Sequence, residues 1–444
     1  MRRIVLAFVA LLLLAAAPAH AVTVQRVTSP GGIEAWLVED HTVPVVSLEL
    51  SFRAGAVLDP VGKEGLSRLA AALLDEAAGD LPNQAFQGKL EDLVTQLGFN
   101  ATLDAVTGSL KTLKQNLQPS ADLLRLAVTA PRFDAEDIER MRSKLQITLA
   151  REAEDPHAMA QRAWFRAAFP DHPYGRGSRG TLAGMAAVTA DDLRAWTREH
   201  LTRDVLVIGV AGDIDAAALA PLLDQVFGAL PKTAPRATIT DVAPADPGAM
   251  MLIPLPIPQS VVLMAEGGMK RSDPDFYAAY LLNHILGGGG FTARLTDEVR
   301  EKRGLAYSVS SGLANYEHVP LIQVQTATKA ASVTEAVQLI RAEWARFGQG
   351  GPTADELANA KLFLTGSFPL QLDSTGRLAG TLVQLQIDQL GIDYLDRRNA
   401  LIEAVTLDQA QRVAKRLFDP AALSTVVVGP AGELKATKAT PTGG

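Results

Sequence analysis

Arg300 and Tyr307 are two hydrogen-bond donors whose spacing could serve a reaction. Both lie in the stretch LTDEVREKRGLAYSV (295–309), where Arg300 is near the end of a segment typical of a charged helix and Tyr307 begins a run typical of a β-strand. Donors of this kind can stabilise negative charge that forms on an oxygen atom during a reaction. They supply neither a nucleophile nor a metal. The alternative is that Arg300 lies along a helix surface and Tyr307 packs as an ordinary strand aromatic.

The rest of the sequence contains no recognisable nucleophile or metal motif. It has no cysteine, which excludes thiol catalysis and thiolate metal sites, and no P-loop or G-x-S-x-G elbow. The glycine run LGGGG (286–290) lacks the residues of a phosphate-binding loop, so a flexible helix C-terminus is the favoured interpretation. No histidine pair has the spacing of a helical zinc site, and the isolated His172 and His284 are predicted to be structural.

The first 21 residues are predicted to be a secretory signal. Arg2 and Arg3 precede an apolar stretch that ends at Ala17, and the segment Ala19 to Ala21 is a small-x-small cleavage site. Cleavage after Ala21 would place the mature chain in the periplasm or outside the cell, with a retained membrane anchor as the alternative. No later segment is long and apolar enough for a membrane helix, so no membrane contact is expected after cleavage.

The charge of the mature chain argues against nucleic acid as a partner. The full sequence has 42 basic and 49 acidic residues, so loss of Arg2 and Arg3 leaves 40 basic residues and a formal charge of 40 − 49 = −9. Nucleic-acid-binding domains depend on clustered positive charge. Apolar residues make up 48% of the chain and charged residues 20%, so sizeable cores are expected.

A repeat in the sequence predicts two similar domains. The segment 187–214 resembles the segment 404–433, and each has a threonine-capped helix followed by a β-rich run that ends at glycine. A weaker resemblance relates 52–74 to 265–287. The fold class is therefore predicted to be α+β, with two tandemly duplicated domains that each pack helices on an antiparallel-rich sheet. Chance similarity between two helix–strand pairs is the alternative.

The predicted domains span residues 22–232 and 250–444, and the proline-rich segment 233–249 is the predicted linker. One strand of the first domain is predicted from strict alternation in VVSLELSFRAG, which indicates a half-buried antiparallel strand. Its apolar face would carry Val46, Leu48, Leu50 and Phe52, and its polar face Ser47, Glu49, Ser51 and Arg53. A long helix is predicted to begin after Asp134 and to end at Asp155-Pro156.

These features together resemble the pitrilysin/insulinase family of zinc metallopeptidases, which includes mitochondrial processing peptidase. The resemblance rests on the duplicated α+β halves, the proline-rich linker and the segment EVREKRGLAYSV (298–309), and it extends over essentially the whole mature chain. In that family the N-terminal half carries an inverted zinc motif, H-x-x-E-H, on its first helix, and a later acidic helix supplies a distal glutamate. The C-terminal half contributes an arginine and a tyrosine, which here would be Arg300 and Tyr307.

The resemblance implies that this chain has lost the zinc site. Aligning the family motif with GLSRLAAA puts Arg68 at the first histidine, Ala71 at the catalytic glutamate and Ala72 at the second histidine, and the distal glutamate falls at Thr148. None of these side chains can replace the imidazole and carboxylate ligands that zinc prefers, and alanine cannot act as a base. No metal or other cofactor is therefore expected in this chain.

The resemblance further implies that the chain is half of a clamshell and inactive alone. Some family members work as pairs of related subunits, so the expected partner is a zinc-bearing homologue that carries H-x-x-E-H, with a peptide as substrate. Tyr307 would then stabilise the oxyanion at the scissile carbonyl, and Arg300 would bind substrate. Two alternatives remain open. One is a scaffold or peptide-binding protein of the same fold without any role in proteolysis, and the other is a hydrolase that uses unrecognised groups.

Overall fold

Strands from the N-terminal half build a six-stranded sheet. The structure is a computed structural model that describes residues 23–441, so the predicted signal peptide lies outside the described residues. The strand order is β1-β2-β6-β3-β5-β4, in which the β2–β6 pair is parallel and the other pairs are antiparallel. The strands are β1 (Gln25–Thr28), β2 (Glu34–Glu39), β3 (Val45–Phe52), β4 (Gln96–Ala101), β5 (Val106–Leu113) and β6 (Leu206–Gly212).

The C-terminal half repeats this sheet without the first strand. Its order is β7-β11-β8-β10-β9, with β7–β11 parallel and the remaining pairs antiparallel, which matches β2-β6-β3-β5-β4 strand for strand. The strands are β7 (Met250–Ile253), β8 (Gln259–Gly267), β9 (Ala306–Asn315), β10 (Pro320–Lys329) and β11 (Ser424–Val428). The predicted α+β fold class is confirmed. The domain limits at residues 232 and 250 stay a prediction.

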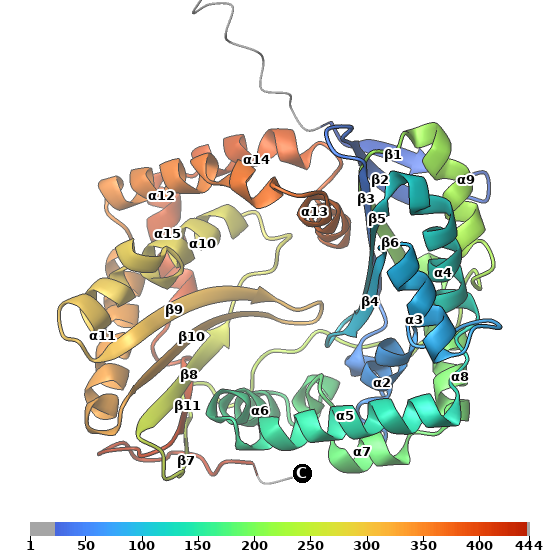
Figure 1. Ribbon diagram of the computed structural model, residues 1–444. Helices are drawn as coiled ribbons and strands as arrows, with labels where there is room; N and C mark the ends of the chain where they lie inside the picture. Colours follow the sequence, from blue (N-terminus) through green and yellow to red (C-terminus); the bar gives the residue numbers. More distant parts are fainter. Residues whose placement is uncertain (1–22, 442–444) are drawn as a thin grey trace, which may run out of the picture.

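Helices line both sheets and connect them (Figure 1). Those of the N-terminal half are α2 (Leu66–Leu73), α3 (Asn83–Asp92), α4 (Leu117–Thr129), α5 (Ala135–Glu154), α6 (Pro156–Ala168), α7 (Leu182–Ala187), α8 (Ala190–His200) and α9 (Ala216–Phe227). Those of the C-terminal half are α10 (Phe276–Asn283), α11 (Val333–Gly350), α12 (Ala354–Gly366), α13 (Thr375–Ile387), α14 (Tyr394–Glu403) and α15 (Leu407–Leu417). Within residues 23–441, no helix has the length and apolar character that crossing a bilayer requires.

The sequence repeat corresponds to equivalent elements in the two halves. Thr189 caps α8 by accepting a hydrogen bond from the backbone N–H of Asp192 at 3.2 Å, and β6 follows. Thr406 caps α15 by accepting from the N–H of Gln409 at 3.2 Å, and β11 follows. A threonine at this position satisfies a helix N–H that has no partner within the helix. The predicted threonine-capped helices before β-strands are confirmed.

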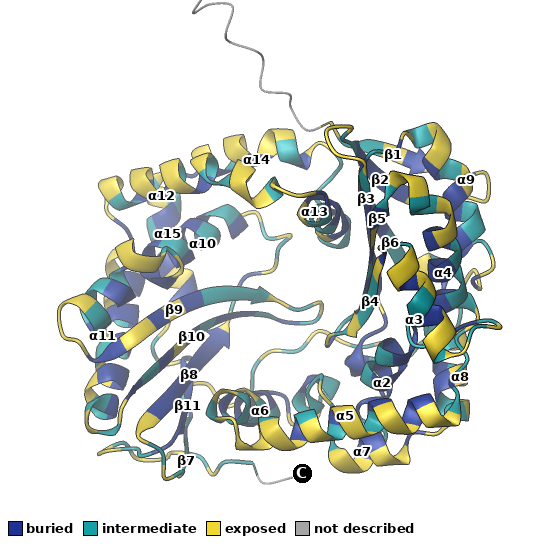
Figure 2. Ribbon diagram, viewed as in Figure 1, coloured by how far each residue is buried: buried dark blue, intermediate teal, exposed yellow. Residues whose placement is uncertain are grey.

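The two halves exchange one helix each. Helix α13, from the C-terminal half, packs on β3 and β6 of the first sheet, while α6, from the N-terminal half, packs on β8 and β11 of the second. Gln386 of α13 donates to the carbonyl of Ile208 at 2.9 Å, and the Trp164 indole of α6 donates to Ser424 Oγ at 3.0 Å. Each sheet is thus enclosed between helices of its own half and one helix of the other. Figure 2 shows the central strands β3, β6 and β8 largely buried, β9 partly exposed, and the outer sides of α5, α12 and α14 exposed.

This exchange corrects the prediction that β3 is half-buried. Its polar face lies under α13, where the Ser47 and Thr375 hydroxyls are 2.8 Å apart, and Ser47 and Ser51 are as inaccessible to solvent as Leu50 on the opposite face. Alternation identified the strand and its apolar face correctly. It could not reveal a covering helix that lies more than 300 residues later in the chain.

The predicted long helix is confirmed as α5, which begins after Asp134 and ends at Asp155. Asp155 ends α5 and caps α6, because its carboxylate accepts a hydrogen bond from the N–H of Ala158 at 2.7 Å and Pro156 opens the second helix. Asp134 precedes α5 as predicted, but its carboxylate binds Arg132 at 2.7 Å and accepts no hydrogen bond from the helix. The Asp-Pro pair therefore ends α5, as predicted, and also begins α6, a helix that was not predicted.

The α13 interface generates a prediction about Gly209 in β6. A Cβ added at Gly209 would collide with the Ala379 carbonyl oxygen of α13 and would lie 3.0 Å from Leu382 Cβ. Gly209→Ala should therefore force α13 away from the sheet and lower the free energy of unfolding by about 1–3 kcal/mol, as overpacking typically does. Urea denaturation measures the change. Gly98→Ala in β4 is the matched control, because a Cβ there meets no atom within 4 Å. Equal stability of the two variants would contradict the close packing.

Glu49 lies on the same polar face of β3, opposite Gly209, and burial raises the pKa of its carboxyl to about 7 from an ordinary 4.5. The folded state thus holds a proton that the unfolded state releases between pH 4.5 and 7. Stability should fall as the pH rises through this window and level off above it. Glu49→Gln should flatten that part of the pH profile, as measured by urea denaturation at pH 5, 6 and 8. Parallel profiles for the wild type and the variant would show that Glu49 is not responsible.

Candidate functional site

Arg300 and Tyr307 lie beside each other at the start of β9. Arg300 belongs to a π-helical turn, η7 (Thr296–Glu301), and its guanidinium carbon lies 5.2 Å from the centroid of the Tyr307 ring and 4.7 Å from that of Phe291. Aromatic rings at these distances attract a cation. Its Nε is 3.3 Å from the carboxylate of Glu301. The predicted location of Arg300 at a helix end and of Tyr307 at a strand start is confirmed.

The Tyr307 ring projects into solvent. It is 85% exposed, and Phe291 is 72% exposed. The adjacent pairing of β9 with β10 is irregular, because the register shifts between Thr326 and Thr328. Such a bulge redirects a neighbouring side chain. The ring therefore does not pack as an ordinary strand aromatic, which was the structural alternative for this residue. Any functional role of Arg300 and Tyr307 stays a prediction.

Phe291 is a neighbour that the sequence analysis missed. It follows the glycine run, whose first part forms the π-helical turn η5 (His284–Gly288) after α10, so the interpretation of a helix end is confirmed. The glycines also allow close packing against β9, since a Cβ at Gly287 would lie 2.6 Å from Ser311 Oγ. Gly290 has a positive φ of 64° and directly precedes Phe291. An aromatic residue directly after such a run was the available signal for an exposed ring.

The four positions aligned with the zinc motif lie on α2 and α5. Arg68 donates to the carbonyl of Arg179 at 3.1 Å, and its guanidinium is 3.8 Å from the Glu152 carboxylate. Glu152 also binds the Arg179 guanidinium at 2.5 Å. Burial lowers the pKa of Arg68, and the nearby Glu152 carboxylate opposes that shift. An Arg–Glu–Arg cluster is therefore built around Arg68, and neither Glu152 nor Arg179 was recognised from the sequence.

The remaining aligned positions offer no metal ligand. Ala71 is 1% exposed in the core, Ala72 packs against that core, and the Thr148 hydroxyl donates to the Lys144 carbonyl of its own helix at 3.0 Å. Across residues 23–441, no group of three or more histidine, cysteine, aspartate or glutamate side chains is arranged to hold a metal ion. A guanidinium, two methyl groups and an engaged hydroxyl do not fit zinc.

The Arg300–Tyr307 pair lies apart from the four positions that align with the zinc motif. Tyr307 is the second of the 10 residues of β9, so it lies roughly 26 Å from the far end of that strand. That far end leads into a hairpin fixed to the N-terminal half, where the Glu317 N–H donates to Asp104 at 3.0 Å and the His318 N–H donates to the Tyr174 hydroxyl at 3.1 Å. Figure 1 shows α2 beyond this hairpin end. Within their own chain, Arg300 and Tyr307 are therefore separated from the aligned positions by most of the length of β9.

This chain is similar to known proteins, and two of the matches cover 94% of its length. Residues 187–364 match the family model described as "Peptidase M16 inactive domain". An uncharacterized zinc protease of Streptomyces coelicolor is 29% identical, with 94% of this chain and 92% of that protein aligned. The non-peptidase homolog YmxG of Helicobacter pylori is 25% identical, with 75% and 77% aligned. The crystal structure of a peptidase M16 inactive domain from Pseudomonas fluorescens is 28% identical, has a TM-score of 0.86, and covers 94% of this chain and 100% of its own.

The donor set around Arg68 leads to a prediction about metal content. After incubation with zinc and dialysis, the purified mature chain should hold far less than one zinc ion per molecule, because its aligned side chains supply no imidazole or carboxylate. Mass spectrometry of metals measures this, with a known zinc enzyme treated alongside. A chelator should leave the thermal unfolding midpoint unchanged. One tightly held zinc ion per chain would contradict the loss of the site.

Proposed function

Because this chain belongs to the M16 peptidase family, the pitrilysin/insulinase family of the resemblance, we propose that it is the zinc-free subunit of a heteromeric zinc metallopeptidase that degrades peptides. Its partner would be a homologue that carries H-x-x-E-H. The match to the inactive domain of the family and the Arg–Glu–Arg cluster around Arg68 support a chain that is inactive alone. The proposed compartment is the periplasm, on the strength of the predicted signal in residues 1–21.

The exposed cluster of Phe291, Arg300 and Tyr307 is the observation that carries the proposal. The Tyr307 ring is 85% exposed beside the Arg300 guanidinium, so most of its surface is available to a partner. Facing a partner's zinc site, the Tyr307 hydroxyl would donate a hydrogen bond to the oxyanion that forms at the scissile carbonyl. Arg300, already oriented by two rings, would bind a carbonyl or carboxylate of the peptide.

A scaffold or peptide-binding protein of the same fold is the second candidate. The observation that favours it is the Helicobacter pylori relative, which is named a non-peptidase homolog and aligns with 75% of this chain. Such a protein could bind a peptide or another subunit without contributing to cleavage. The two candidates differ in one respect that can be measured, which is whether Tyr307 affects the rate of a partner's reaction.

Tyr307→Phe should lower the kcat of the assembled complex about 10²–10³-fold, because it removes one oxyanion donor and leaves the ring in place. KM should change little. Arg300→Ala should impair both kcat and KM, since a guanidinium can contact the peptide before and during the reaction. Each variant is co-purified with the zinc-bearing homologue, its stoichiometry and zinc content are checked, and cleavage of a fluorogenic peptide is measured at steady state.

Arg303→Ala is the matched control for this experiment. Arg303 lies close to Arg300 in the chain, but its guanidinium is engaged elsewhere. It donates to the Glu298 carboxylate at 2.6 Å and to the Glu298 backbone carbonyl at 2.9 Å. Its loss should leave the cleavage rate near that of the wild type. If the Tyr307→Phe complex assembles normally and cleaves as fast as the wild type, the composite site is wrong and the scaffold candidate is favoured.

A further inference from the structure

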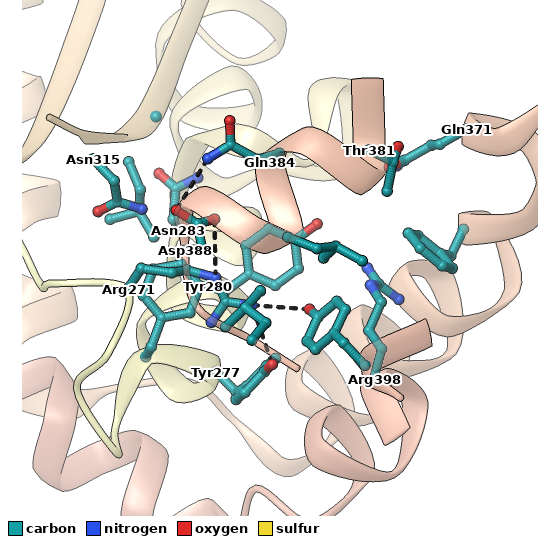
Figure 3. A pocket seen from close by; sticks show the side chains of 17 residues that line it. Arg271, Tyr277, Tyr280, Asn283, Asn315, Gln371, Thr381, Gln384, Asp388 and Arg398 are labelled. Carbon is teal, nitrogen blue, oxygen red and sulfur yellow. Dashed lines mark hydrogen bonds and ion pairs between the residues drawn. The ribbon is translucent and has the colours of Figure 1, made fainter. Parts of the chain in front are cut away.

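A second site lies between helices of the C-terminal half, away from Arg300 and Tyr307. It is a pocket of about 490 Å³ bounded by α10, the end of β9, α13 and α14, and Figure 3 shows the side chains that line it. This volume is within the range of small-ligand sites. Two arginines, Arg271 and Arg398, come from segments more than 120 residues apart and line the same pocket.

Arg271 is held in a fixed orientation by aromatic residues. Its guanidinium carbon lies 4.2 Å from the centroid of the Phe276 ring, and it donates to the hydroxyls of Tyr277 at 3.1 Å and Tyr394 at 2.9 Å. Asp388 is its nearest carboxylate, at 3.9 Å from Nε, and accepts a hydrogen bond from Gln384 at 3.0 Å (Figure 3). Burial raises the pKa of Asp388, and the bond from Gln384 and the charge of Arg271 oppose that shift.

Arg398 is buried without a carboxylate partner among the described residues. It is 5% exposed, and its guanidinium carbon lies 3.9 Å from the centroid of the Phe368 ring. Its two hydrogen bonds, to the Leu364 carbonyl and to Asn399 Oδ1, are both 3.1 Å long and both leave from Nη1. The other guanidinium nitrogens keep donors for a ligand. A buried positive charge with only neutral partners is costly unless an anion joins it.

The charges and walls of the pocket together define a ligand. The lining includes two guanidinium groups and one carboxylate, Asp388, so the pocket carries a net positive charge that an anion would neutralise. Burial raises the pKa of Tyr394, so its hydroxyl stays protonated beside the arginines. Planar guanidinium groups bind carboxylates with two parallel hydrogen bonds. The aromatic rings along the walls suit an apolar side chain attached next to that carboxylate.

We propose that this pocket binds the C-terminal residue of a peptide, with Arg398 holding the free carboxylate and the aromatic walls holding an apolar or aromatic last side chain. Residues 312, 313 and 315 of β9 line the pocket, and β9 is the edge strand of the second sheet, so a peptide lying along that edge leads into it. The inference rests on the proposed peptide-handling function. It concerns binding by this chain alone, so its failure and that of the composite site are separate results.

The test compares two forms of one peptide on the wild-type chain. An N-terminally labelled hexapeptide that ends in phenylalanine is prepared with a free C-terminal carboxylate and with a C-terminal amide, and binding is measured by fluorescence polarisation. The acid should bind at least about tenfold more tightly than the amide, as expected for a lost charged hydrogen bond. N-acetylphenylalanine, which carries the same terminal group without the peptide, should compete only weakly. Equal binding of acid and amide, or no binding of either, would overturn the proposal.

Two variants test whether Arg398 is responsible for the preference for the free carboxylate. Arg398→Met keeps much of the side-chain length without the charge and should bind the acid and the amide equally. Arg397→Met is the matched control, because Arg397 is on the same helix but pairs with Asp393 at 2.6 Å and does not line the pocket. It should keep the full preference for the acid. Loss of the preference in both variants would also overturn the assignment. If Arg398→Met does not fold, as judged by circular dichroism, the acid and amide comparison on the wild type still decides.

Discussion

The close approach of the α13 backbone to the first sheet at Gly209 is the contact on which the arrangement of the molecule depends. A glycine there lets a helix of the C-terminal half lie against β3 and β6, and α6 makes the reciprocal contact with the second sheet. Among the described residues, the main helical cover of that face comes from the other half in each case. The two halves are therefore joined through their cores, which makes their relative position a property of packing rather than of the segment between residues 227 and 250.

Local patterns predicted the elements well but could not predict what covers them. Alternation located β3, and threonine caps located α8 and α15, because each signal depends on residues close together in the chain. The buried state of Ser47 and Ser51 depends on α13, which no local pattern connects to β3. Asp155 was correctly predicted to end α5, but its second role as the cap of α6 was not predicted, because the following helix was not recognised.

The candidate sites show the same division. The spacing of Arg300 and Tyr307 was visible in one short stretch, and the structure puts their side chains in contact. The Phe291 ring lies beside Arg300 as well. Its position follows from the close packing of the preceding glycine run against β9, which the sequence did not reveal. The pocket around Arg271 and Arg398 was not foreseen, because it is assembled from several elements that are distant in sequence and meet only in the folded chain. A candidate site made of residues close in sequence could be recognised from their types. A site made of residues distant in sequence became visible only in the folded structure.

The exchanged helix also constrains the order in which the chain can reach its native state. The first sheet gains its last strand, β6, by residue 212, yet the face of β3 and β6 stays uncovered until α13, at residues 375–387, has been made. Chains normally fold from the N-terminus as they are synthesised. Here the N-terminal half must wait through about 160 further residues, a non-local closure of the kind that slows folding. In that interval the Ser47, Glu49 and Ser51 side chains of β3, which the finished fold covers with α13, remain open to solvent.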